Sequence, residues 1–189
     1  MRFLRGGLFR GLPLAVPPAG KPSIARIDSP NRPTTQDSSV RNWYEIEMLT
    51  TRLIHPGILS ALGQAGHGSQ VLIADGNYPF STESPATAAK VFLNLRRGLV
   101  SVSDVLEVLV ETIPIESVVV MSHPQGEAVA IQEEFRRILP ATASLTGKPR
   151  LDFYAAAKSP STALVIATGE ERRFSNVLLT IGVIRTNEI

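Results

Sequence analysis

The 189-residue sequence contains no cysteine, which excludes disulfide bonds and zinc sites built on thiolates. This absence fits a reducing compartment. No apolar run reaches the roughly 20 residues that a membrane-spanning helix needs. Aromatic residues make up only 6% of the chain, and no basic stripe is interleaved with them, which argues against nucleic-acid binding. We therefore expect a cytoplasmic protein that binds neither a membrane nor nucleic acid.

Acidic residues are absent before Asp28, whereas the same stretch holds five lysines and arginines. Six prolines between residues 13 and 33 interrupt any helical or strand pattern there. Residues 1–47 are therefore predicted to be a tail. Three interpretations remain open: a disordered segment or one translated from an upstream start before Met48, an organelle transit peptide, or a secretory signal. A transit peptide would place the protein in an organelle.

Residues 48–189 contain 12 basic and 13 acidic side chains and show regular apolar patterns. Helices alternate with short apolar runs, and Ser103 is the expected N-cap of the second helix. We predict a single α/β domain with a mainly parallel, Rossmann-like sheet flanked by helices. The predicted strands cover residues 71–74, 91–95, 118–121, 163–168 and 177–183, and the predicted helices begin near residues 56, 103, 126 and 151.

A histidine between two glycines, Gly66-His67-Gly68, leads into the first predicted strand, which ends at Asp75. Histidine exchanges protons near neutral pH, and glycines allow close approach of a ligand to the backbone. This pattern indicates a site for proton transfer. The alternative is that His67 bonds locally at a helix end and that Asp75 caps a turn. His123 follows another strand and could line the same edge of the sheet as Asp75.

Two further segments carry polar groups. Residues 168–176 lie between two predicted buried strands, and the backbone amides and the Asn176 side chain there could hold sugar-like hydroxyls. Arg150 precedes a predicted helix and offers a rigid fork of donors. The alternatives are a charged surface turn and an exposed arginine at a helix start.

Gly63, Gly66 and Gly68 do not form a dinucleotide-binding fingerprint, because a helix precedes them and a strand follows, the reverse of the required order. The sequence also lacks the Gly-x-Ser-x-Gly motif and the His-Glu-x-x-His zinc motif.

Several blocks between residues 55 and 183, in the right order, resemble the D-ribose pyranase and L-fucose mutarotase family. The matching blocks are His55-Pro56, Gly66-His67-Gly68, Ile73-Ala74-Asp75 with Asn77 and Pro79, Arg150 with Phe153-Tyr154, Thr168-Gly169-Glu170, Asn176-Val177-Leu178-Leu179 and Gly182-Val183.

The resemblance implies a cofactor-independent isomerase that interconverts anomers or ring forms of a free sugar by general acid–base catalysis. It assigns His67 as the proton donor, with no metal involved. Asp75 would bind sugar hydroxyls and help to hold His67. Arg150 and the segment Phe174-Ser175-Asn176 would also bind the sugar. Family members assemble into ring-like homo-oligomers with sites near subunit contacts, so self-association is expected.

Two residues depart from the family pattern. Phe174 stands where the family usually has tyrosine and lacks the phenol that could donate or relay a proton. Arg97 stands where mammalian-type fucose mutarotases carry an acid. The motif around His67, together with Asn77 and Arg150, favours the L-fucose branch over the D-ribose branch. The alternative function is a non-catalytic monosaccharide-binding or regulatory protein on the same scaffold.

Overall fold

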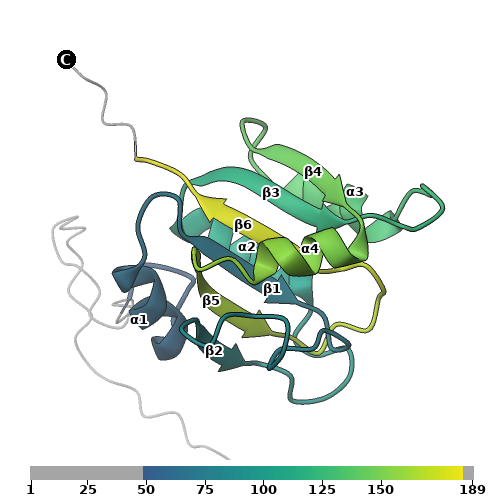
Figure 1. The fold of residues 1–189 in the computed structure, drawn as a ribbon. Coiled ribbons are helices and arrows are strands. Elements are labelled where there is room, and N and C mark those ends of the chain that lie inside the picture. Colours follow the sequence, from purple (N-terminus) through teal and green to yellow (C-terminus); the bar gives the residue numbers. More distant parts are fainter. Residues whose placement is uncertain (1–48, 185–189) are drawn as a thin grey trace, which may run out of the picture. The chain divides into compact units, whose positions relative to one another are not determined.

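A computed structural model describes residues 49–184 of the chain (Figure 1). The predictions for residues 1–47 lie outside the described residues and stay predictions. None of the helices between residues 49 and 184 is long and apolar enough to cross a membrane.

Within residues 49–184, six strands form one sheet: β1 (Gln70–Ala74), β2 (Ala89–Phe92), β3 (Ile115–Met121), β4 (Ser144–Lys148), β5 (Thr162–Ala167) and β6 (Val177–Ile181). Their order is β2-β5-β1-β6-β3-β4. The pairs β1/β5, β2/β5 and β3/β4 are parallel, whereas β6 runs antiparallel to β1 and β3. The predicted α/β domain with a mainly parallel sheet is confirmed, and one antiparallel strand lies inside it.

Successive side chains of the central strands enter two separate apolar layers. In β1, Val71 and Ile73 belong to the larger layer, whereas Leu72 and Ala74 belong to the smaller one. Because neighbouring side chains of a strand point to opposite faces, both faces of β1 are covered. This burial explains why the strand is a continuous apolar run.

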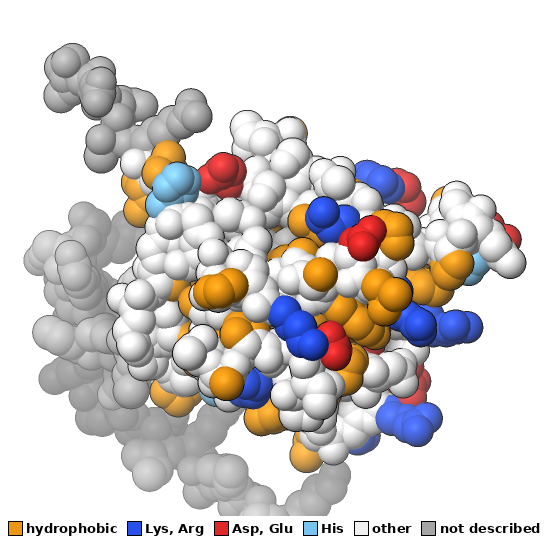
Figure 2. Space-filling view, viewed as in Figure 1, with side chains coloured by type: hydrophobic (Ala, Val, Ile, Leu, Met, Phe, Trp, Pro, Cys, Tyr) orange, Lys and Arg blue, Asp and Glu red, His pale blue; other side chains and the backbone are white. Residues whose placement is uncertain are grey.

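In the described part of the chain, four helices cover the sheet: α1 (Pro56–Gln64), α2 (Val102–Thr112), α3 (Ala130–Ile138) and α4 (Arg150–Ala157). The first three contribute to the larger layer, with Leu106 and Phe135 fully buried in it. The fourth lies on the opposite face, where Phe153 packs in the smaller layer (Figure 1). Figure 2 shows hydrophobic side chains between charged ones on the α4 face.

The helix starts follow local hydrogen bonding. His55 caps α1, where its Nδ1 accepts from the Ile58 amide at 3.3 Å, and Pro56 occupies the first turn. Ser101 caps α2 in a capping box with Asp104. The prediction that Ser103 caps this helix was wrong. The Ser101 hydroxyl accepts a hydrogen bond from the Asp104 amide, so the helix begins after Ser101 and Ser103 lies buried inside its first turn.

The strand directions bring several loops to one edge of the sheet. β1, β3, β4 and β5 end at this edge, and the antiparallel β6 begins there. In open α/β sheets, ligands bind outside the carboxyl ends of the strands. A ligand-binding site is therefore expected among the loops that follow these strands.

Candidate functional site

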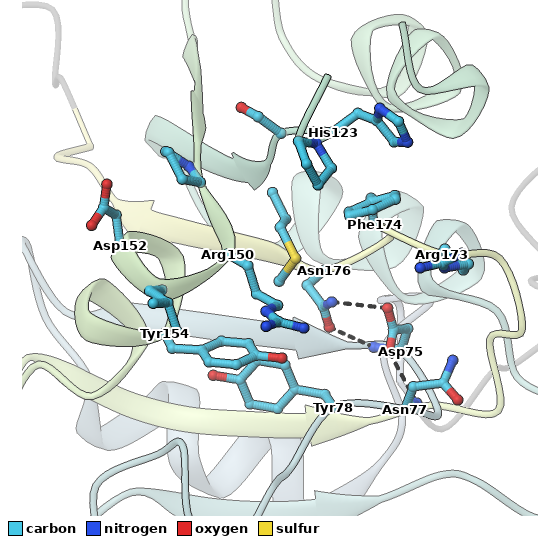
Figure 3. Close-up of a pocket in the computed structure, with 15 residues that line it drawn as sticks. Asp75, Asn77, Tyr78, His123, Arg150, Asp152, Tyr154, Arg173, Phe174 and Asn176 are labelled. Atoms are coloured by element: carbon cyan, nitrogen blue, oxygen red, sulfur yellow. Dashed lines mark hydrogen bonds between the residues drawn. The ribbon is translucent and has the colours of Figure 1, made fainter. Parts of the chain in front are cut away.

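A cavity of about 880 Å³ opens at the carboxyl ends of the parallel strands (Figure 3). Asp75 reaches it from the end of β1, and His123 from the loop after β3. Arg150 begins α4, while Phe174 and Asn176 lie in the segment that leads into β6. Residues separated by up to 101 positions in the sequence therefore line one cavity.

Asp75 and Asn176 form the best-defined pair in the cavity. The Asn176 Nδ2 donates to Asp75 Oδ2 at 2.8 Å, and the Asp75 backbone amide donates to Asn176 Oδ1 at 2.9 Å. The Asn77 amide donates to the other carboxylate oxygen, Oδ1, at 3.0 Å. Because each carboxylate oxygen has a second lone pair, the fixed carboxylate can still accept hydrogen bonds from a ligand hydroxyl.

Burial raises the pKa of Asp75 above its ordinary value of 3.8, and the hydrogen bonds from Asn77 and Asn176 offset part of that rise. Desolvation disfavours the charged form of a carboxyl group, whereas donors to that form favour it. The Asp75 side chain is only 4% exposed, so the first effect prevails. A buried carboxyl group with a perturbed pKa in a cavity is typical of a functional site.

Two tyrosines and an arginine form the wall opposite this pair. Tyr78 and Tyr154 meet edge to face with ring centroids 5.3 Å apart. The Tyr78 hydroxyl donates to the Glu83 carbonyl at 2.6 Å, and burial raises the pKa of Tyr78. Arg150 extends over the tyrosines toward Asn176 (Figure 3). The wall thus combines aromatic faces with a charged donor, as binding sites for small polar ligands do.

Phe174 has a left-handed backbone with φ of 61°, which is uncommon for a residue with a side chain. Its ring packs edge to face against His123, with centroids 5.1 Å apart. The Arg173 guanidinium lies 5.5 Å from the centre of the same ring. Backbone strain of this kind persists only where the surroundings enforce it and often occurs at ligand sites.

An ion-pair network holds the strained segment. The Arg172 guanidinium donates to both carboxylate oxygens of the buried Glu170, at 2.9 and 2.7 Å, and to Glu134 of α3 at 2.8 Å. Burial alone would raise the pKa of Glu170, but the hydrogen bonds from Arg172 outweigh it and lower that pKa. Residues 170–172 therefore anchor the loop, with Glu170 buried and the Arg172 side chain about half exposed.

Ser175 does not line the cavity. Its side chain is fully buried, and its hydroxyl donates to the Arg172 carbonyl at 2.6 Å. That Ser175 binds a ligand stays a prediction, because a serine hydroxyl that donates within its own loop can still accept a hydrogen bond. In this structure Ser175 stabilises the backbone between the anchor and Asn176.

His67 lies at the amino end of β1, whereas Asp75 lies at its carboxyl end. The five-residue strand between them, at about 3.3 Å per residue, is roughly 16 Å long. The expectation that Asp75 holds His67 in place is therefore wrong within one chain. His67 instead lines a second cavity of about 730 Å³, where its Nε2 lies 2.8 Å from Glu116 Oε2.

Sequence analysis assigned no role to Tyr78, Arg173 and Glu116, and Tyr154 entered only as part of a block that matches the family. Tyr154 stands four residues after Arg150, a spacing that brings two side chains together on one helix face, so this pair was within reach. Glu116 has no local signal, because its partner His67 lies 49 positions away, whereas Arg173 contacts its neighbour Phe174 and Tyr78 donates to the Glu83 carbonyl five positions on. Within residues 49–184, no group of three or more histidine, aspartate or glutamate side chains could hold a metal ion.

The family described as the RbsD/FucU transport protein family matches residues 48–184. The match spans the whole of the sheet and both cavities. The chain belongs to the RbsD/FucU family.

Solved structures of three proteins resemble this member of the family. RbsD from Bacillus subtilis complexed with D-ribose is 22% identical, with a TM-score of 0.64 over 73% of this chain and 100% of that one. The fucose mutarotase from Streptococcus pneumoniae in complex with L-fucose is 24% identical, with a TM-score of 0.59 over 70% and 95%. FucU from Bifidobacterium longum is 25% identical, with a TM-score of 0.53 over 70% and 97%. At these low identities the first two likenesses establish the shared fold.

Proposed function

We propose that this protein is a cofactor-independent monosaccharide mutarotase or pyranase that interconverts anomers or ring forms of a free sugar. The observation that carries the proposal is the buried Asp75–Asn176 pair, which opens into a cavity that Arg150 also lines. A carboxylate, an amide and a guanidinium supply the mixed acceptors and donors that a ring of hydroxyls requires. Membership of the RbsD/FucU family supports this reading.

Catalysis of this reaction requires only proton transfers, which accompany the breaking and re-forming of the bond between C1 and the ring oxygen. Ring opening removes the proton of the anomeric hydroxyl, breaks the bond between C1 and the ring oxygen, and delivers a proton to that oxygen. Rotation about the C1–C2 bond and the reverse steps give the other anomer. A positioned imidazole can accept and return the proton, which is the role we propose for His67.

His67 does not line the cavity that contains Asp75 and lines the second cavity instead. We propose that His67 of a second copy reaches the sugar beside Asp75, so that the working unit is a ring-like homo-oligomer. Two observations support this arrangement: the His67 side chain is 59% exposed, and the cavity with Asp75 is open to the surface. A head-to-tail contact that closes into a ring would repeat the same pairing around the assembly.

The lining of the cavity favours L-fucose over D-ribose. Met121, Leu151 and Phe174 give the wall an apolar part, against which the methyl group of a 6-deoxy sugar could pack. D-ribose has no such group. Burying one methyl group is worth about 0.8 kcal/mol, so the expected preference is only a few-fold.

Saturation-transfer NMR on the full-length protein tests the proposal by measuring anomer exchange of L-fucose and D-ribose. We expect faster exchange than in buffer alone and loss of the enhancement in His67→Ala and in Asp75→Ala. Glu111→Gln is the matched control, since Glu111 is exposed and pairs with Arg52 outside both cavities. Wild-type protein that leaves the exchange of both sugars at the buffer rate contradicts the proposal.

One observation favours the alternative of a non-catalytic sugar-binding protein. Phe174 lines the cavity without a hydroxyl, and its ring packs between His123 and Arg173. Under this alternative, wild type binds sugar saturably without accelerating exchange. Exchange that appears only in Phe174→Tyr would establish it, whereas exchange in wild type excludes it.

A further inference from the structure

His67 has a carboxylate partner that neither the motif around it nor the fold class predicts. Its Nε2 lies 2.8 Å from Oε2 of Glu116, 49 positions away near the start of β3. This distance is short enough for a charge-assisted hydrogen bond. The pair lines the second cavity with mainly apolar neighbours, among them Val110 and Ile113.

The backbone around the pair is fixed by the end of β6. The Gly68 amide donates to the Ile181 carbonyl at 2.9 Å, and the Gly182 amide donates to the Pro114 carbonyl at 2.8 Å. A Cβ on Gly182 would stand 3.4 Å from both the Cβ and the backbone nitrogen of Glu116, at the close limit of ordinary van der Waals contact. The two hydrogen bonds therefore bring the segments that carry His67 and Glu116 against one strand end.

We infer that Glu116 is a positioning residue for His67, a role that rests on the function proposed above. The Glu116 carboxylate accepts a hydrogen bond from His67 Nε2–H. This bond places the proton of the neutral ring on Nε2 and leaves Nδ1 as the atom that exchanges protons with the sugar. A carboxylate that fixes the tautomer and orientation of a histidine is a recurrent arrangement in acid–base catalysis.

The contact between His67 and Glu116 is less well explained as an ion pair that only stabilises the fold. The His67 and Glu116 side chains are 59% and 55% exposed, and exposed pairs contribute about 0–1 kcal/mol to stability. Covering the second cavity by another copy would exclude water from the pair and strengthen the same bond. The geometry is thus better suited to orienting a group at a contact between copies than to stabilising the monomer.

The other two histidines lack this arrangement. His55 Nδ1 is engaged in capping α1. His123 Nδ1 accepts from the Gln125 amide at 3.4 Å and lies 3.8 Å from Glu127, beyond hydrogen-bond distance. All three histidines of the chain lie within residues 49–184, and among contacts between these described residues only His67 has a bonded carboxylate.

Two substitutions distinguish the effect of the negative charge of Glu116 from the effect of its hydrogen-bond-accepting oxygen. Glu116→Ala removes both, whereas Glu116→Gln removes the charge and keeps an oxygen that can accept from Nε2–H. We expect Glu116→Ala to lower the exchange rate at saturating sugar by about tenfold to a hundredfold, the effect of a misplaced reacting group, with little change in KM. Glu116→Gln should lower the exchange rate by a smaller factor. Glu111→Gln, which removes an equally exposed charge, should leave the rate unchanged.

The nitrogen-15 chemical shifts of the His67 ring report the tautomer directly. Wild type and Glu116→Gln should hold the proton on Nε2, and Glu116→Ala should show a mixture of tautomers. A wild-type rate in Glu116→Ala, while His67→Ala is inactive, would overturn the positioning role and leave the proposed function intact. Wild type without any exchange would overturn the proposed function and this role together. Mixed tautomers in wild type would show that Glu116 does not fix the ring.

Discussion

His67 and Asp75 stand at opposite ends of the same strand, β1, and open into different cavities. Eight positions separate them in sequence, so a motif that joins them suggests one site. The extended backbone of β1 excludes that, because a strand separates its ends by its full length. If both residues act on one sugar, they must come from different copies of the chain.

Subunit complementation is the first prediction. His67→Ala and Asp75→Ala should each be inactive, because each lacks one of the two groups in every site. Co-assembly of the two variants from denatured chains at equal amounts should restore about a quarter of wild-type exchange, since one site in four draws an intact residue from each contributing copy. Saturation-transfer NMR measures the rate before and after mixing.

The control for that experiment replaces Asp75→Ala with the double variant that carries both substitutions. This mixture contains no intact His67, so co-assembly should restore nothing. Failure of the two single variants to regain any exchange after co-assembly would mean that a site does not combine His67 and Asp75 from different copies.

The pH dependence of stability is the second prediction, and it follows from Asp75. Burial raises the folded-state pKa of this carboxyl group above 3.8, so the folded protein holds its proton to higher pH than the unfolded chain does. Stability from this group is therefore complete below pH 3.8 and is lost as the pH rises through the folded-state pKa. Asp75→Asn cannot titrate and lacks this dependence.

Urea denaturation of both proteins between pH 3 and pH 8 measures the effect. We expect the free energy of unfolding of wild type to fall relative to that of Asp75→Asn as the pH rises above 3.8, and then to level off. The hydrogen-bond mismatch between the new amide and Asn176 adds a constant offset without changing the slope. A difference that grows in favour of wild type with rising pH would mean that hydrogen bonding, and not burial, dominates at Asp75.

The central strands and the loop ends beside them could be predicted from the sequence for a physical reason. β1, β5 and β6 are buried on both faces, so their sequences are nearly continuous apolar runs, and polar residues at their ends stand out. Asp75 and Asn176 were found in this way. Both line the cavity, and for Asp75 this follows the rule that ligands gather at the carboxyl ends of strands.

Other features depend on contacts that no local pattern records. β4 is an edge strand of sequence Ser-Leu-Thr-Gly-Lys, paired only with β3 and half exposed, so it has no apolar signal. The antiparallel direction of β6 also leaves no mark in an apolar run. The bond between His67 and Glu116 joins residues on strands separated by β6, and only the sheet order brings them together.

The loop anchor gives the third prediction. Arg172→Ala should leave the Glu170 carboxylate buried without its guanidinium partner, at a cost of about 2 kcal/mol in the free energy of unfolding near neutral pH. The cost should shrink at low pH, because the stability that Arg172 gives through the lowered pKa of Glu170 is lost as the pH falls through the folded-state value. Urea denaturation at several pH values measures both effects.

Arg136→Ala is the matched control, since Arg136 pairs with Glu133 on the exposed surface of α3. Its cost should stay within about 0.5 kcal/mol, as for other exposed pairs. Equal costs for the two arginines, or a cost of Arg172→Ala that grows at low pH, would show that Arg172 and Glu170 do not form a stabilising pair.

The fourth prediction concerns two glycine-to-alanine substitutions that should change the free energy of unfolding in opposite directions. A Cβ on Gly169 would overlap the carbonyl oxygens of Arg96 and Leu99, which are backbone atoms and cannot rotate away. The Gly169 amide also donates to the Val100 carbonyl at 2.9 Å, so the two segments are held together. Gly63 is different, because it lies within α1 and nothing stands within 4 Å of its added Cβ.

We expect Gly169→Ala to lower the free energy of unfolding by about 3 kcal/mol, the upper range for overpacking, and Gly63→Ala to raise it by about 0.5 kcal/mol through helix propensity. Gly169 directly precedes the anchor at Glu170, so its substitution should also slow sugar exchange by displacing Phe174 and Asn176. Gly63→Ala should exchange at the wild-type rate. Urea denaturation and saturation-transfer NMR give the two quantities, and a Gly169→Ala protein as stable as wild type would mean that residues 96–100 do not pack against residue 169.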